Sequence, residues 1–188
     1  AGDVRIQRFR DRLRALEDRL GNDGEDDESI NERCEQLRGQ MLEFEQKEYT
    51  ERSEKYPTDR LIRFHLGEVA FRTGDIETAM GCFQKSKDEP RIRTQSGHLL
   101  GQCFAREGWH AEAIAEYKDV LSKMDTTEGE LEIRYHLMLS LIELATAERS
   151  EQHAREALEI CSGIARKDIT YRDIRSRRKE IDELVKSL

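Results

Sequence analysis

The feature that most constrains this chain is an internal repeat with a period of 34 residues. Five positions recur when the sequence is shifted by that period: Leu66 with Leu100, Gly67 with Gly101, Gly74 with Gly108, Ala79 with Ala113, and Phe83 with Tyr117. All five matches fall in one register, and none lies in a low-complexity tract. We therefore expect an array of stacked units, in which neighbouring repeats bury a shared core.

The recurring residues indicate that each unit is a pair of helices. Gly67 and Gly101 would lie inside a helix, where glycine costs roughly 1 kcal/mol relative to alanine. That cost is reasonable where a neighbouring helix approaches closely. Gly74 would end the first helix of a pair, and Asp75 would cap the second. Phe83 would fill the gap between one pair and the next.

With this period and these residues, the chain resembles the tetratricopeptide repeat (TPR) family. The resemblance implies an all-α fold, an antiparallel TPR helix-pair superhelix. We expect repeats at about 60–90 and 94–124 and a divergent third repeat at 131–168. A charged helical hairpin before the repeats, Tyr-Pro-Thr-Asp at 56–59 and Asp-Ile-Thr-Tyr-Arg-Asp-Ile at 168–174 are similar to bacterial TPR scaffold proteins.

The third repeat departs from the pattern. Met138 replaces the helix glycine, and no glycine marks the turn. Two alanines can match Ala79: Ala154 needs four extra residues between the helices, and Ala157 needs seven. The spacing of the apolar residues that follow favours Ala157. A last amphipathic helix at 171–187 is expected to cap the array.

Two amphipathic stretches precede the repeats. Apolar residues recur in them at alternating spacings of three and four, at Ile6, Phe9, Leu13, Leu16 and Leu20, then at Ile30, Cys34, Leu37, Met41 and Phe44. An acidic loop at 21–28 separates the stretches, and Ser29 is expected to cap the second helix. The pattern predicts a coiled-coil-like antiparallel hairpin. We therefore predict a hairpin domain at 1–56 and a TPR domain at 57–188.

The second helix of this hairpin is expected to end at Tyr56-Pro57, with Thr58 or Asp59 capping the next helix. Tyr49 and Tyr56 lie beside the earlier apolar stripe rather than on it. We therefore expect the later half of the helix to pack on the first repeat.

Composition limits the classes of function. Charged residues make up 38% and aromatic residues 6%, which favours solvated helices around a thin core. The net charge of −8 disfavours nucleic acid as a partner. No apolar run has the length of a membrane span, so no membrane partner is expected. The four cysteines stand far apart without a CxxC pair, which predicts reduced, buried thiols and a cytoplasmic protein.

No pattern of catalytic, cofactor-binding or metal-binding residues is found, so we predict neither an enzyme nor a cofactor. His65, His98 and His136 recur at a similar repeat phase, which suggests a metal site or a pH switch. Half-exposed helical histidines are commoner, and that interpretation is favoured. Seven Arg and Lys residues at 166–179 could contact phosphates or an acidic protein, but a solvated outer face is favoured.

TPR proteins commonly bind peptides on a concave face that the first helix of each pair lines. Carried onto this chain, the resemblance implies a partner-binding surface of Phe64, Glu68, Phe71, Arg72, His98, Gln102, Ala105, Arg106, Tyr135, Leu139 and Ile142. The Lys, Asn and Arg set that grips a C-terminal carboxylate in some members is absent. The chain's own helix at 30–56 is an alternative occupant of this surface. We expect it to cover the Phe64 end and to leave the His98–Tyr135 end more open.

These observations predict a non-enzymatic scaffold or adaptor that binds a segment of another protein on the TPR concave surface. The alternative is a structural self-assembly protein, a homo-oligomer formed through residues 3–56. The sequence does not name the partner.

Overall fold

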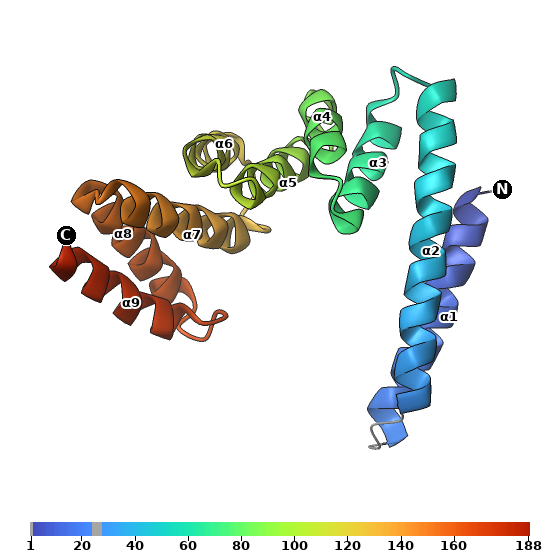
Figure 1. The fold of residues 1–188 in the computed structure, drawn as a ribbon, viewed down its shortest axis with the longest axis horizontal. Coiled ribbons are helices and arrows are strands. Elements are labelled where there is room, and N and C mark those ends of the chain that lie inside the picture. Colours follow the sequence, from blue (N-terminus) through green and yellow to red (C-terminus); the bar gives the residue numbers. More distant parts are fainter. Residues whose placement is uncertain (1, 24–27) are drawn as a thin grey trace. The chain divides into compact units, whose positions relative to one another are not determined.

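The computed structural model describes residues 2–23 and 28–188, which form nine α-helices and no strand (Figure 1). The helices are α1 (Gly2–Asp23), α2 (Glu28–Lys55), α3 (Arg60–Thr73), α4 (Ile76–Ser86), α5 (Arg93–Arg106), α6 (His110–Lys123), α7 (Glu130–Glu148), α8 (Glu151–Lys167) and α9 (Ile174–Ser187). The prediction of an all-α fold is confirmed over these residues.

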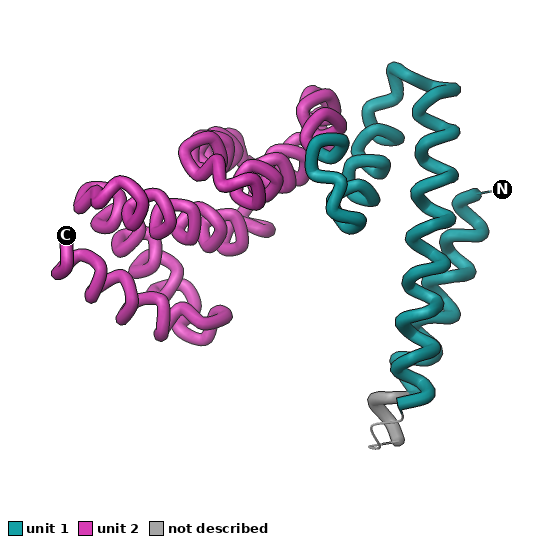
Figure 2. Tube along the Cα trace, in the orientation of Figure 1, with its two compact units in different colours: residues 1–79 teal, residues 80–188 magenta. Residues whose placement is uncertain are grey.

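The helices belong to two compact units, residues 1–79 and residues 80–188 (Figure 2). The boundary between the units falls inside α4. In the first unit α2 packs on both α1 and α3. In the second unit each helix from α5 to α9 packs on the next. The predicted domain division after residue 56 stays a prediction.

In the first unit, α1 and α2 form the predicted antiparallel hairpin (Figure 1). Buried Ile6, Tyr49 and Val69 bring α1, α2 and α3 into one core. The ring of Tyr49 also stacks on that of His65, with 5.2 Å between the centroids. The predicted packing of the later half of α2 on the first repeat is therefore confirmed for Tyr49. For Tyr56 it is wrong, because this side chain at the end of α2 is 49% exposed.

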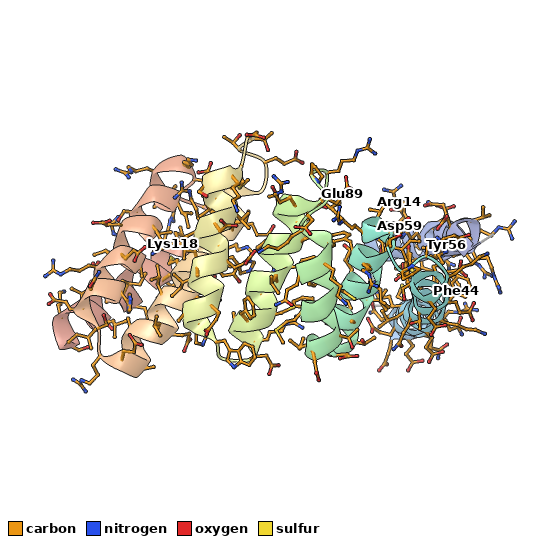
Figure 3. The ribbon with its side chains drawn as sticks, turned by 90° about the horizontal axis from the view of Figure 1, so that it is seen from above. Arg14, Phe44, Tyr56, Asp59, Glu89 and Lys118 are labelled. Carbon is orange, nitrogen blue, oxygen red and sulfur yellow. The ribbon has the colours of Figure 1, made fainter. Side chains whose placement is uncertain are left out.

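The turn between the hairpin and the repeats follows the predicted capping chemistry. Asp59, at the start of α3 (Figure 3), accepts hydrogen bonds from the backbone N–H groups of Leu61 and Ile62 at 3.0 and 3.1 Å. Gly74 ends α3 with φ 84°, a left-handed conformation that costs glycine little. The Asp75 carboxylate then accepts from the backbone N–H of Thr78 at the start of α4.

The hairpin loop differs from the prediction where it is described. α1 continues through Asp23, and α2 already includes Glu28. Ser29 therefore lies inside the helix, and its predicted role as the N-cap is wrong. The rest of the predicted loop lies outside the described residues.

The core of the second unit explains the glycine inside the first helix of the second repeat. A Cβ atom on Gly101 would lie 2.4 Å from Cε1 of Tyr117, which is closer than atoms can approach. Tyr117 is itself 1% exposed, in a cluster with Ala113, Met138 and Leu141. Gly101 therefore lets α6 pack against α5, as the sequence predicted.

The third repeat corrects the predicted register. α7 runs ten residues past Met138, whereas α3 runs six residues past Gly67, and two-residue turns follow both helices. Ala154 therefore lies four residues after the N-cap of its helix, as Ala79 does, and the preference for Ala157 is wrong. The four extra residues add about one turn to α7, which leaves its packing face nearly unchanged.

The turn after α7 forms without glycine. Arg149 adopts a left-handed conformation with φ 51°, and the Ser150 hydroxyl caps α8 by accepting from the backbone N–H of His153. α9 closes the second unit, and its Ile174 and Ile181 are buried against the core. It begins three residues later than predicted, because Tyr171 lies in the preceding turn.

Two global expectations concern membranes and thiols. None of the described helices is both long and apolar enough to span a membrane. Cys34, Cys82, Cys103 and Cys161 are all buried, and no disulfide joins them to one another. Burial raises the pKa of the Cys103 thiol to about 12, so this side chain packs as a small apolar group.

Candidate peptide-binding surface

In the first repeat, the predicted binding residues are held by the chain itself. Phe64 is 4% exposed, and the Glu68 carboxylate lies 2.9 Å from Nδ1 of His65. Arg72 donates to Glu45 of α2 at 2.5 Å. Phe71 is partly buried. Glu68 and Arg72 are therefore engaged within the first unit, and Phe64 is buried.

Glu45 is the centre of this contact. Its side chain is only 1% exposed, and Arg10 of α1 reaches its second oxygen at 3.4 Å. Burying a carboxylate is costly unless cations and hydrogen bonds compensate for lost water. Two arginines from α1 and α3 supply this compensation, so Glu45 links the three helices of the first unit.

The second unit has a surface hollow of about 230 Å³ between α5, α6 and α7. We call it the α5–α7 hollow, and its lining residues are Gln102, Ala105, Arg106, His110, Tyr117, His136, Leu139, Ser140 and Glu143. The structure thus brings together Gln102, Ala105, Arg106 and Leu139, which the sequence placed on the binding surface. Tyr117 is buried, whereas Arg106 is exposed.

Two histidines form a hydrogen-bonded pair beside the α5–α7 hollow. Nε2 of His98 lies 2.8 Å from Nδ1 of His136, and Nε2 of Gln102 lies 3.2 Å from the same His98 nitrogen. One histidine of the pair donates its ring N–H to the other, and the tautomers decide which one donates. The pair therefore joins the first helices of the second and third repeats.

Both histidines of this pair are neutral at pH 7. Burial, followed by the charge of His136, lowers the pKa of His98 to about 4. Burial also lowers the pKa of His136, and Arg172 acts in the same direction. Glu132 opposes both shifts. The pair therefore contributes neutral hydrogen-bonding groups, with no positive charge, to this surface.

Tyr135 and Ile142 do not belong to an open groove. Tyr135 is 6% exposed, and its hydroxyl donates to Asp173 at 2.5 Å. The guanidinium of Arg172 lies 4.9 Å from the Tyr135 ring centroid. Ile142 is 6% exposed within the core. The prediction of an open surface as far as Tyr135 is therefore wrong, because the turn between α8 and α9 covers this residue.

The sequence missed several residues of the α5–α7 hollow, chiefly His110, Tyr117 and Glu143. Tyr117 was assigned to packing between repeats, and it also lines the hollow. Glu143 could have been found, since it lies four residues after Leu139 and so one helical turn away. Nδ1 of His110 is buried and without a hydrogen-bond partner. No pattern in the sequence pointed to His110.

The basic cluster at 166–179 is partly neutralised within the second unit. Lys167 pairs with Glu130 at 2.6 Å, and Arg172 pairs with Glu132 at 3.0 Å. Arg177 pairs with both an aspartate and a glutamate. Within the described residues, no group of three or more His, Cys, Asp or Glu side chains is arranged to hold a metal ion.

The chain is similar in fold to two crystal structures of MamA. One matches with a TM-score of 0.59 and 15% identity, over 91% of this chain and 98% of MamA. The other matches with a TM-score of 0.54 and 17% identity, over 91% of each chain. No family model and no curated protein sequence matches this chain. At these identities the likeness shows the fold alone, a TPR-type helical fold.

Proposed function

We propose that this protein is a non-enzymatic scaffold that binds a segment of another protein in the α5–α7 hollow. The observation that carries the proposal is the composition of this hollow. Ala105 and Leu139 supply apolar surface beside the buried Tyr117 ring, and Gln102 and Arg106 stand beside them. A concave apolar surface with a few polar groups beside it is typical of recognition sites.

The size of the α5–α7 hollow favours a peptide over a small-molecule cofactor. Its volume of about 230 Å³ is below the roughly 300–1,000 Å³ of most ligand pockets. One apolar side chain of a peptide fits such a space, while the rest of the peptide lies along α5 and α7. Arg106 and Glu143 carry opposite charges, so they can orient polar groups on either side of that anchor.

This proposal narrows the binding surface that the sequence predicted. Gln102, Arg106 and Leu139 remain ligand contacts, and His98 supports them through its bonds to Gln102 and His136. Phe64, Glu68, Phe71 and Arg72 are assigned to packing within the first unit. Tyr135 is assigned to the contact with the α8–α9 turn.

The four thiols support a reducing compartment for this scaffold. All are buried, and their positions at packing sites give them no need to form disulfides. We place the protein in the cytoplasm of a bacterium, in keeping with the similarity of its sequence motifs to bacterial TPR scaffold proteins. Fractionation of the native host would test this compartment directly.

The test is a selection of displayed peptides on the intact protein, followed by measurement of their affinities. Selected peptides should share one apolar residue flanked by polar residues. A Leu139→Asp variant should weaken their binding by at least about tenfold, because the charge would have to be buried beside the anchor. Fluorescence anisotropy with labelled peptides provides the dissociation constants.

A matched control uses the same change elsewhere. Leu61, on α3, is 50% exposed and does not line the α5–α7 hollow, so Leu61→Asp should bind the selected peptides as the unchanged protein does. Far-ultraviolet circular dichroism checks that both variants stay folded. Equal binding by the Leu139→Asp and Leu61→Asp variants would refute the proposed site.

A further inference from the structure

The outer part of the α1–α2 hairpin is only two helices thick. Leu13, Leu16, Leu37 and Met41 follow the predicted apolar stripe, yet all four stay partly exposed. By contrast Ile6, which also contacts α2 and α3, is 3% exposed. Two helices enclose this seam only in part: Ile30 and Cys34 of α2 are buried, whereas the four residues named above remain partly open to water.

One open side of this seam forms a basic groove. Its lining residues are Arg12, Ala15, Leu16 and Arg19 from α1, and Arg33, Gln36, Leu37 and Gln40 from α2. None of these eight residues is acidic, although the whole chain carries a net charge of −8. Within the described residues, Arg12, Arg19 and Arg33 take part in no ion pair. We call this surface the hairpin groove.

The neighbouring side of α2 carries the opposite charge. A shallow surface there is lined by Glu28, Asn31, Glu32, Glu35 and Gln36, with no cation among them. We call it the acidic face. Glu35 pairs with Arg38, while Glu28 and Glu32 have no ion-pair partner within the described residues. Gln36 belongs to both surfaces, so the hairpin groove and the acidic face adjoin along one helix.

We infer that the hairpin groove binds the hairpin of a second copy of this chain, forming a two-fold symmetric four-helix bundle. In a two-fold dimer, a contact from one copy to the other is always repeated in reverse. A chain with adjoining basic and acidic surfaces satisfies this rule, because the acidic face of each copy meets the hairpin groove of the other. The position of Gln36 places the symmetry axis near this residue.

The two kinds of contact in this dimer have different tasks. Burial of Leu16 and Leu37 drives association, since the removal of apolar surface from water is the dominant favourable contribution to protein association. Exposed ion pairs between Arg12 or Arg19 and Glu32 add little free energy each. These ion pairs fix the orientation of one copy relative to the other, and they make the association sensitive to salt.

Charge reversal tests this inference by analytical ultracentrifugation of the full chain. The unchanged protein should form dimers at micromolar concentration. A variant with Arg12→Glu, Arg19→Glu and Arg33→Glu, and a second variant with Glu28→Lys and Glu32→Lys, should each raise the dimer dissociation constant by at least about tenfold. An equimolar mixture of the two variants should recover dimers, because the altered charges again have opposite signs across one side of the bundle.

Two controls isolate the surface. Arg14→Glu reverses an exposed charge on α1 outside the hairpin groove (Figure 3), and its dimer should be unchanged. Leu16→Ser should weaken dimers without changing any charge, which separates apolar burial from electrostatics. Circular dichroism confirms that each variant stays helical.

Three results would overturn the inference. One is an unchanged protein that stays monomeric at high concentration, whether or not it captures an acidic helical peptide from another protein. Another is a dimer that both charge-reversed variants keep. The third is a mixture of variants that recovers no dimer although each stays folded. None of these results bears on the α5–α7 hollow, which is tested separately through peptide binding.

Discussion

Arg72 and Arg106 occupy the same repeat position, one period of 34 residues apart, but their surroundings differ. Arg72 ends α3 and donates to buried Glu45 of α2. Arg106 ends α5 and lines the α5–α7 hollow. The repeat determines the position of each residue on its helix, and the neighbouring helices decide whether that residue joins an ion pair with a buried carboxylate, as Arg72 does, or lines an exposed hollow, as Arg106 does. Equivalent repeat positions therefore need not share a function.

The equivalence of Arg72 and Arg106 depends on the repeat register. Substitution of Gly101 tests this register and should have the largest effect on stability. Gly101→Leu should lower the free energy of unfolding by about 3 kcal/mol, because its Cβ alone would lie 2.4 Å from Tyr117 Cε1. Urea denaturation followed by circular dichroism measures the change. Tyr117 is 1% exposed in the core cluster, so moving its ring aside would disturb its packing on Ala113, Met138 and Leu141.

Gly163 in α8 provides the matched control. No atom lies within 4 Å of a Cβ placed there, so Gly163→Ala should be neutral or stabilise by up to about 1 kcal/mol. A Gly101→Leu variant as stable as the Gly163→Ala variant would mean that α5 and α6 do not approach closely, and the register would fail.

Much of the fold could be predicted because its signals are local. Asp59 and Gly74 act at the ends of one helix, and Gly101 meets Tyr117 within a single repeat. The register of the third repeat could not be predicted in the same way. Its four extra residues continue the helix, and Arg149 makes the turn that glycine usually marks.

The candidate site was less predictable because its contacts join distant parts of the sequence. Tyr135 bonds to Asp173, 38 residues away, and no periodic pattern indicates such a contact. Glu45 looks like an ordinary solvated acid in the sequence, yet it is 1% exposed between two arginines. Partner arginines on separate helices explain its burial, and only the fold shows them together.

The contact between α5 and α7 can be tested by changing the pH, which should alter the free energy of unfolding by about 2 kcal/mol. The pKa of His98 is about 4 in the folded protein and about 6.5 in the unfolded chain. As pH falls, the unfolded chain therefore binds a proton first, and stability is lost between pH 6.5 and 4. Above pH 6.5 His98 contributes no pH dependence.

Between pH 7 and pH 5, His98 should thus reduce the free energy of unfolding by about 2 kcal/mol, measured by urea denaturation. A His98→Gln variant should lose this part of the pH dependence, while the lowered pKa of His136 keeps a smaller part in the same direction. The window stays above the range in which Asp173 and Glu130 titrate, because their pKa values are lowered. An identical pH profile for His98→Gln would show that the pair does not hold α5 against α7.

The smallest expected effect comes from the two arginines themselves, and it tests the comparison most directly. Arg72→Gln should lower the free energy of unfolding by about 1–2 kcal/mol, because Glu45 stays buried with only the longer contact from Arg10. The value is below that for a fully buried pair, since the Arg72 side chain is 44% exposed. Arg106→Gln should change stability by less than about 0.5 kcal/mol, because the residue is exposed.

For binding of a peptide selected on the α5–α7 hollow, the order should reverse. Arg106→Gln should weaken the peptide complex measured by fluorescence anisotropy, while Arg72→Gln should leave it unchanged. If both substitutions lowered stability equally and neither changed peptide binding, the two positions would have the same role, and the difference between the covered and the open repeat would not hold.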